Sequence, residues 1–191
     1  MNIIDQTGVA EQTVNKSKFL AWASNCQTEK EVSAFLSTIA SLHHSASHLA
    51  YAFRLKTPAG IILRFSDAGE PSGTAGKPIL QLLEGRDLIN ACVGVIRYYG
   101  GVNLGKGGLA RAYGSTAKLA IDAAIQKPYV EMQDLSLIVE YNQLDTLINM
   151  LAQLGGSIIN KTFADKVHLS IRLPTTEVEA FKSRFQSEYK T

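Results

Sequence analysis

The sequence predicts an α+β protein in two domains, a larger one over residues 1–127 and a smaller one over residues 128–191. Three observations support this. Apolar runs typical of strands alternate with stretches whose apolar residues recur every three or four positions, as on one face of a helix. Two glycine-rich segments interrupt the first part of the chain. At Lys127-Pro128 the proline disfavours helix at the preceding residue, and the composition turns acidic.

The composition is that of an ordinary globular protein, with 46% hydrophobic residues and a formal net charge of +2. Up to Lys127 there are thirteen basic and nine acidic residues, and beyond it six and eight. The larger domain therefore carries a mild positive bias, although the chain as a whole is not a nucleic-acid-binding polycation. No apolar run reaches the roughly 20 residues of a membrane span, and residues 1–9 lack the segments of a signal peptide. These features predict a cytoplasmic protein without a membrane partner.

Cys26 and Cys92 form no C-x-x-C pair and lie among apolar or small neighbours. They predict buried thiols in a reducing compartment rather than a disulfide or a zinc site. The sequence predicts no metal site and no cofactor.

In the larger domain the pattern predicts two helices with clear starts and an alanine-rich third. The first follows a capping box at Thr28-Glu29-Lys30-Glu31, and the second begins near Pro78, because proline suits the first helical turn. The third has Leu119 and Ile121 as core contacts. The predicted strands and the third helix lie at residues 13–26 (one or two strands), Leu49–Leu55 with Ile61–Phe65 (a hairpin), Cys92–Tyr99 (a central strand) and Leu109–Ile125 (the helix).

The smaller domain has the pattern strand, helix, strand, strand, helix. The predicted elements are Leu135–Tyr141, Leu144–Leu154, Ile158–Phe163, Val167–Leu173 and Val178–Tyr189.

The first glycine-rich segment runs from Ser66 to Pro78. Its glycines allow positive φ angles and close approach of another surface, and a loop of this length in a compact domain is usually functional or disordered. The alternative is a tight structural loop whose acids cap its own amides. The candidate residues are Ser66, Asp67, Gly69, Glu70, Gly73, Thr74, Gly76 and Lys77.

The second segment, Gly100 to Gly108, follows the predicted central strand. Gly100 to Lys106 match part of a phosphate-binding loop, but Gly107 stands where a Ser or Thr would bind Mg²⁺, which excludes an ATPase of that type. Free amides at a helix N-terminus would still suit an anion. The alternative is that the glycines only allow close packing of helix on strand. The candidate residues for an anion or nucleic acid are Arg97, Gly105, Lys106, Gly107, Gly108 and Arg111.

A histidine cluster, His43-His44-Ser45-Ala46-Ser47-His48, precedes the predicted hairpin. Zinc would need a further ligand, and no Cys, Asp or Glu lies nearby in the sequence. Hydrogen-bonding histidines at a helix-to-strand junction are the simpler interpretation. No Ser/His/Asp arrangement and no G-x-S-x-G elbow occur, so we assign no catalytic residue.

Both glycine segments resemble signatures of the YigZ/IMPACT family. The family pattern S-D-D-G-E-P-x-G-T-A-G-x-P is matched from Ser66 to Pro78, with Ala68 in place of the second aspartate. The pattern R-Y-Y/F-G-G-x-x-L-G-x-G-G-L-x-R/K-A-Y is matched from Arg97 to Tyr113. An earlier H-P-x-A-x-H pattern is met at His43 and His48, and Lys16-Ser17-Lys18-Phe19 resembles an N-terminal K-S-x-F.

The resemblance implies an N-terminal domain like the second domain of a small-subunit ribosomal protein. It also implies a tail like the ferredoxin-like C-terminal domain of elongation factor G, which is β-α-β-β-α-β. Since the predicted second helix of the tail runs to Tyr189, we expect the last strand to be missing. The unpaired edge at Leu135–Tyr141 would then be covered by a neighbouring segment or by a second subunit.

The family also implies a link to translation, because eukaryotic IMPACT proteins restrain a starvation-activated kinase pathway by binding its activator. We therefore expect a non-enzymatic regulator that binds RNA, the ribosome or a translation-related protein through the glycine-loop surface. The alternative is a small-molecule enzyme or sensor that uses Asp67 and Glu70 together with His43 and His48.

Overall fold

The computed structural model describes residues 1–185 and 188–190. The chain divides into two compact units, Met1–Tyr129 and Val130–Thr191, which we call the N-terminal and C-terminal units. The division lies two residues beyond Lys127-Pro128. Each unit has a hydrophobic core of its own.

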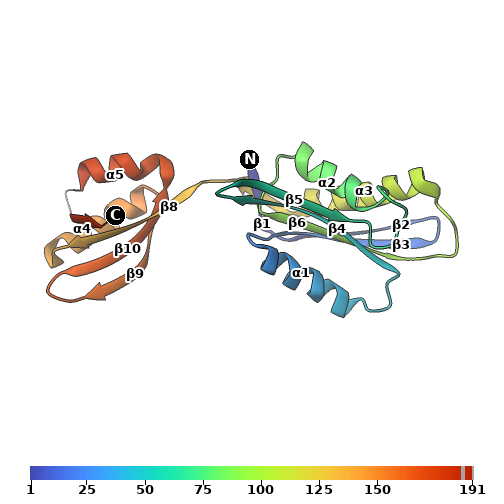
Figure 1. The fold of residues 1–191 in the computed structure, drawn as a ribbon, viewed down its shortest axis with the longest axis horizontal. Helices are drawn as coiled ribbons and strands as arrows, with labels where there is room; N and C mark the ends of the chain where they lie inside the picture. The colour runs from blue at the N-terminus through green and yellow to red at the C-terminus, as the bar shows by residue number, and fades with distance from the viewer. Residues whose placement is uncertain (186–187, 191) are drawn as a thin grey trace. The chain divides into compact units, whose positions relative to one another are not determined.

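The N-terminal unit is built on a five-stranded antiparallel sheet with the order β2-β3-β6-β4-β5. Helices α2 and α3 cover one face of this sheet, and α1 covers the other (Figure 1). A separate antiparallel pair, β1 with β7, joins the two ends of the unit. The bounds are β1 Asn2–Gln6, β2 Gly8–Val14, β3 Ser17–Asn25, α1 Glu29–Leu42, β4 His48–Thr57, β5 Gly60–Ser66, α2 Gly76–Gly85, β6 Ala91–Tyr98, α3 Gly105–Ala123 and β7 Ile125–Pro128.

The start of α1 confirms the predicted capping box. Thr28 Oγ1 accepts a hydrogen bond from the amide of Glu31 at 3.2 Å. The Glu31 carboxylate reaches back to the amide of Gln27 at 2.8 Å, one residue earlier than the usual box. These bonds satisfy amides that an uncapped helix would leave unpaired.

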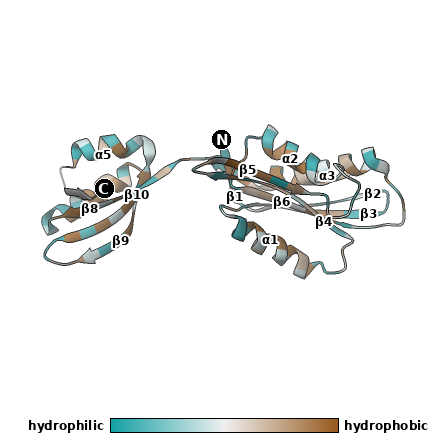
Figure 2. Ribbon diagram, in the orientation of Figure 1, coloured by the Kyte–Doolittle hydropathy of each residue, from teal (hydrophilic) through white to brown (hydrophobic). Residues whose placement is uncertain are grey.

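The central strand β6 separates the two cores of the N-terminal unit, because consecutive residues of a strand point to opposite faces. Val93 and Val95 belong to the core under α2 and α3, whereas Cys92 packs with Cys26 in the cluster that faces α1. Both cysteines are buried and free, as predicted. Helix α2 has the matching amphipathic pattern, with hydrophobic and hydrophilic residues alternating around it (Figure 2).

The third helix begins four residues before the predicted start, at Gly105 instead of Leu109. Glycine lowers helix propensity, but packing overrides it here, since Leu109, Ala112 and Tyr113 of α3 are buried in the core of the unit. Glycines 105, 107 and 108 therefore form the first turn of α3 and are not a loop. The prediction for Leu119 was also wrong, since it is 44% exposed, whereas Ile121 is buried.

The pair of β1 and β7 was not predicted. Each strand is short, and each pairs with a segment about 120 residues away in the sequence, which no local pattern can indicate. The pair closes the unit, because Ile4 is buried in the core. Lys127 and Pro128, which mark the predicted boundary, lie in β7 and belong to this pair.

The C-terminal unit is a four-stranded antiparallel sheet with the order β11-β8-β10-β9. Helices α4 and α5 share one core with the sheet, since Leu147 and Phe181 join strand residues such as Leu137 in a single cluster. The bounds are β8 Met132–Val139, α4 Leu144–Gln153, β9 Ser157–Phe163, β10 Val167–Pro174, α5 Val178–Arg184 and β11 Glu188–Lys190, with short 3-10 turns at Tyr141–Gln143 and Thr175–Glu177.

The expectation of a missing last strand was wrong. Helix α5 ends at Arg184, so enough chain remains for β11, which pairs antiparallel with residues 136–138 of β8. The helix stops early because Phe185 leaves the helical conformation and packs its ring against Phe181 in the core. Of the two expectations for the β8 edge, a neighbouring segment or a second subunit, the structure has the first, since β11 covers residues 136–138.

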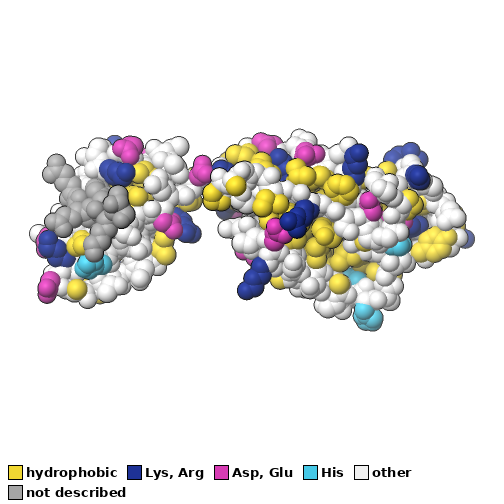
Figure 3. Space-filling view, viewed as in Figure 1, with side chains coloured by type: hydrophobic (Ala, Val, Ile, Leu, Met, Phe, Trp, Pro, Cys, Tyr) yellow, Lys and Arg dark blue, Asp and Glu magenta, His cyan; other side chains and the backbone are white. Residues whose placement is uncertain are grey.

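In the N-terminal unit, the edge of the five-stranded sheet that is formed by β5 exposes apolar side chains. Strand β5 has one neighbour only, β4, and Ile61, Leu63 and Phe65 on it are each more than 40% exposed. Figure 3 shows hydrophobic side chains gathered over this strand, with Lys and Arg side chains scattered around them. In the part of the chain that the structure describes, no helix is long and apolar enough to cross a membrane.

Candidate functional site: a pocket between the two glycine segments

The first glycine segment is held in shape by Asp67. Its carboxylate accepts hydrogen bonds from the amides of Gly73, Ala75 and Gly76 at 2.8–2.9 Å. Burial raises the pKa of the Asp67 carboxyl, but these three amides outweigh it and hold the pKa below its ordinary value. Asp67 therefore caps the start of α2, as the structural alternative for this loop predicted, and its oxygens are engaged in the loop itself.

The rest of the segment is equally ordered. Ala68, Gly69 and Gly73 have φ angles of 48°, 87° and 76°, the left-handed region that glycine adopts most easily. Thr74 Oγ1 donates to the carbonyl of Pro71 at 2.6 Å, and Ser66 Oγ accepts from the amide of Ala68 at 3.2 Å. These contacts turn the chain so that Glu70 points inward.

Glu70 forms a buried ion pair with Arg97. Arg97 Nη1 donates to Glu70 Oε1 at 2.8 Å, and the two side chains are 6% and 4% exposed. Tyr113 Oη donates to the same Oε1 at 2.9 Å. Burial, and after it the Glu70 carboxylate, raise the pKa of the Tyr113 phenol well above its ordinary value. One residue each from the first loop, β6 and α3 are thereby joined in one network.

Arg97 is held by two further kinds of contact. Its guanidinium lies 5.6 Å from the ring centre of Phe19 and 5.1 Å from that of Tyr99. Nη2 donates to Ser17 Oγ at 3.2 Å, while Nε is buried without a hydrogen-bond partner. The sequence predicted Arg97 as a cation for phosphate contacts. In the structure it is 5% exposed, and its charge is paired with Glu70.

His48 lies directly opposite Arg97 in the pairing of β4 with β6. Its Nδ1 is 2.8 Å from the carbonyl oxygen of Ala68, and its Nε2 is 3.9 Å from Glu70 Oε1. The side chain is 26% exposed, so this imidazole connects the buried ion pair with the surface.

The second glycine segment brings the start of α3 to the same place. A Cβ at Gly100 would lie 2.0 Å from the carbonyl oxygen of Lys16, so only glycine fits against the turn between β2 and β3. Helix α3 has no side-chain cap at Leu104. Lys106 and Arg111 are exposed, and the Arg111 guanidinium lies 3.5 Å from the position of a Cβ on Gly107. Two cations therefore lie on the first two turns of α3.

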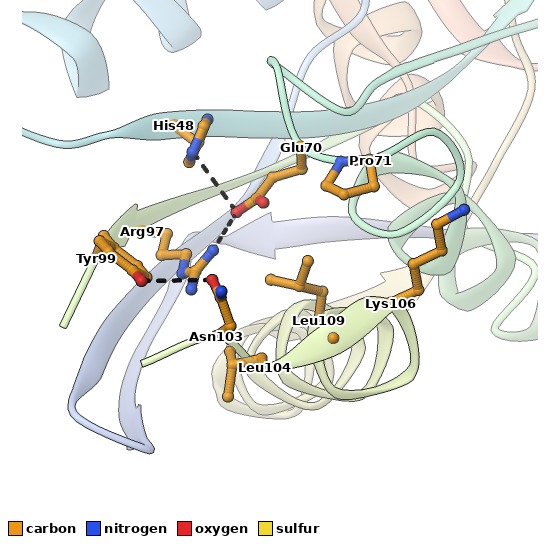
Figure 4. Close-up of a pocket in the computed structure, with 10 residues that line it drawn as sticks. His48, Glu70, Pro71, Arg97, Tyr99, Asn103, Leu104, Lys106 and Leu109 are labelled. Carbon is orange, nitrogen blue, oxygen red and sulfur yellow. Dashed lines mark hydrogen bonds and ion pairs between the residues drawn. The ribbon is translucent and has the colours of Figure 1, made fainter. Parts of the chain in front are cut away.

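Together these elements enclose a pocket of about 510 Å³, which we call the loop pocket. This volume is within the range of small-molecule sites. Figure 4 shows the Glu70 carboxylate between His48 and Arg97, with Tyr99 and Asn103 to one side and Lys106 at the start of α3. The lining residues are His48, Glu70, Pro71, Arg97, Tyr99, Asn103, Leu104, Gly105, Lys106 and Leu109.

The structure brings some of the candidate residues together and separates others. His48, Glu70, Arg97, Gly105 and Lys106 line the loop pocket. Gly108 and Arg111 line a neighbouring pocket on the other side of Leu104. The remaining candidates lie outside this lining, at the end of β5, in the loop, or in the first turns of α2 and α3; they are Ser66, Asp67, Gly69, Gly73, Thr74, Gly76, Lys77 and Gly107.

His43 does not reach the loop pocket. Its Nδ1 is 2.9 Å from Tyr98 Oη, and its ring packs against Trp22. Tyr98 and Arg97 are consecutive on β6 and so face opposite sides of the sheet. The alternative hypothesis placed Asp67, Glu70, His43 and His48 in one site. Two of these four groups do not fit it, because Asp67 is engaged in its own loop and His43 lies on the other face of the sheet.

Several lining or supporting residues received no role from the sequence. Ser17 and Tyr113 bond to the Arg97–Glu70 pair, and Tyr99 donates to Asn103 Oδ1 at 3.4 Å. Ser17, Tyr99 and Tyr113 lie within the family patterns, which was the available signal, but the patterns do not tell which side chains meet. In the described residues no group of three His, Cys, Asp or Glu side chains is placed to hold a metal ion.

Comparison with known proteins matches both parts of the chain. The Impact N-terminal domain matches residues 15–121, and a domain of unknown function, DUF1949, matches residues 137–187. An "IMPACT family member" of Haemophilus influenzae is 34% identical over 92% of this chain and 85% of its own. The "IMPACT family member YigZ" of Escherichia coli is 33% identical over 91% and 85%.

Among solved structures, one described as a hypothetical protein superposes with a TM-score of 0.73 at 32% identity. The match covers 96% of this chain and 89% of that one. The two-domain translational regulator Yih1 matches with a TM-score of 0.43 at 23% identity, over 63% of this chain and 48% of that one.

Proposed function

Because the chain belongs to the IMPACT family, we propose that it is a non-enzymatic, translation-associated regulator that binds RNA through the loop pocket and the cations beside it. Such a role places the protein in the cytoplasm. The observation that carries the proposal is that a pocket with an exposed aromatic ring, Tyr99, lies beside the exposed cations of α3.

The cations supply the part of RNA binding that does not depend on sequence. Lys106 and Arg111 are exposed on the first two turns of α3, where the helix dipole also favours an anion. Lys77 is exposed at the start of α2. Contacts of this kind with phosphates release counterions, so the affinity falls steeply as salt rises.

The pocket supplies the part that could recognise a base. Single-stranded RNA is bound by aromatic side chains on which unstacked bases lie and by polar groups that reach the base edges. Tyr99 is 50% exposed, and Glu70, His48 and Asn103 are polar groups of the same lining. A catalytic role is less well supported, since Asp67 is engaged in the loop and His43 is on the other face of the sheet.

The fold kinship expected from the family is part of the proposal. We infer that the C-terminal unit is ferredoxin-like, on the basis of its β-α-β-β-α-β sequence and its strand order β11-β8-β10-β9. For the N-terminal unit, likeness to the second domain of a small-subunit ribosomal protein rests on the family resemblance. These kinships are analogies of fold and do not assign a function by themselves.

Filter binding with total RNA and with ribosomes at low and at moderate salt tests the proposed function. We expect binding that weakens steeply with salt. Lys106→Ala and Arg111→Ala should each weaken binding and lower the salt slope by about one. Lys118→Ala is the matched control, because Lys118 is on the same helix but pairs with Asp122.

The absence of binding to RNA and ribosomes under both conditions would refute the proposal. If a translation-related protein binds the same surface and RNA does not compete with it, the chain is a protein-binding module instead.

A further inference from the structure

Two hydrogen-bond acceptors face each other in the loop pocket. The Ala68 carbonyl oxygen can only accept, so the His48 Nδ1 that lies 2.8 Å away carries the proton. In the neutral ring, Nε2 is then an acceptor. It points toward the Glu70 carboxylate, which accepts only, and the Nε2–Oε1 distance of 3.9 Å is too long for a direct hydrogen bond.

No protein group supplies the donor that this arrangement lacks. Both hydrogen bonds to Glu70 end on Oε1. Among the described residues no donor bonds to Glu70 Oε2 or to His48 Nε2. The described residues' buried side-chain atoms without a partner are Arg54 Nε and Arg97 Nε, so Glu70 Oε2 and His48 Nε2 open to the pocket that both residues line. The pocket is therefore complementary to a ligand that brings N–H donors.

The walls and charges restrict what that ligand is. Pro71, Leu104 and Leu109 provide apolar lining, and Tyr99 adds an exposed ring. With a neutral imidazole, the lining carries two positive side chains and one negative side chain. A cationic amine is therefore disfavoured, and a neutral, flat donor group attached to an anion fits better.

We propose that the loop pocket takes one unpaired nucleobase that carries an exocyclic amino group, as adenine, cytosine and guanine do. The amino group donates to His48 Nε2 and to the Glu70 carboxylate, the base lies against the apolar lining and Tyr99, and the adjoining phosphate lies toward Lys106. This inference rests on the proposed RNA binding and adds its base preference. Uracil, which presents a carbonyl oxygen where cytosine has the amino group, is disfavoured because that oxygen would face the two acceptors.

Fluorescence anisotropy with labelled single strands of about eight nucleotides tests the preference. We expect oligo(A) and oligo(C) to bind about tenfold or more tightly than oligo(U) at one fixed salt concentration. In His48→Phe, which removes one of the two acceptors and leaves Glu70, the preference for oligo(A) over oligo(U) should become smaller. His43→Phe is the matched control, since it alters the imidazole on the opposite face of the sheet, and it should keep the preference.

A second measurement needs no variant and therefore stands even if His48→Phe fails to fold. Adenosine monophosphate should displace labelled oligo(A) about tenfold more effectively than purine riboside monophosphate, which differs only by lacking the amino group.

The outcomes separate this inference from the proposed function. Equal binding of oligo(U) and oligo(A), with salt-dependent binding retained, overturns the base preference and leaves RNA binding standing. No binding of any strand refutes both. Displacement of oligo(A) by a lysine-containing peptide but not by adenosine monophosphate overturns the inference in favour of an amine ligand.

Discussion

Replacing Arg97 by methionine should destabilise the N-terminal unit by about 3 kcal/mol, at the low end of the 3–5 kcal/mol range for breaking a buried ion pair. The substitution keeps the length of the side chain but removes the charge. It leaves the Glu70 carboxylate, which is 4% exposed, with Tyr113 as its remaining donor. The low end applies because Arg97 Nε is already without a partner, so the native arginine is incompletely satisfied.

The double variant separates the charge pair from packing. Removing both charges, as in Arg97→Met with Glu70→Leu, leaves no unpaired ion, and such replacements are often nearly neutral. We therefore expect the double variant to recover most of the loss seen in Arg97→Met. The coupling free energy between the two sites should then be about 2 kcal/mol or more, at the upper end of what contacting residues show.

Urea titration followed by tryptophan fluorescence measures these free energies. The chain has one tryptophan, Trp22, on β3 of the N-terminal unit, so the signal reports on this unit and not on the C-terminal one. Losses of less than about 1 kcal/mol in Arg97→Met, or losses that simply add in the double variant, would contradict the buried pair.

Three further predictions concern the supports of the pocket. Asp67→Asn should lower the free energy of unfolding by about 1–3 kcal/mol, because it weakens three hydrogen bonds from backbone amides. The pKa of Asp67 is lowered on folding, so wild type loses stability as the pH falls below about 4. In acid titrations this loss should be smaller in Asp67→Asn. Gly100→Ala should strongly lower the melting temperature, because its Cβ would meet the carbonyl of Lys16 at 2.0 Å, whereas Gly85→Ala, with open space around it, should leave the melting temperature unchanged or raise it. The pKa of Tyr113 is raised on folding, so its contribution to stability is full below the ordinary value of 10.0 and is lost as the pH rises above that value; urea titrations from pH 8 to 11 should show a smaller decline in Tyr113→Phe than in wild type.

Most regular elements could be predicted from the sequence, because each leaves a local pattern. The capping box at Thr28, the hairpin of β4 and β5 and the continuous apolar run of β6 are of this kind. The family followed from the long matches in the two glycine segments, which the comparisons confirm. The start of α3 was missed, because packing of the helix on the core outweighs glycine's low helix propensity. The last strand β11 was missed, because Phe185 packs on Phe181 and ends α5 early.

The sequence by itself determined which residues were candidates for the site, because the glycine segments and their acids, hydroxyls and cations can be seen in the chain. Only the tertiary structure decided their roles. It assigned Asp67 to capping α2, turned Arg97 inward to Glu70, and placed His43 and His48 on opposite faces of one sheet. The physical reason is that side-chain direction on a strand alternates with each residue, and the partners come from segments up to about 80 residues away in the chain.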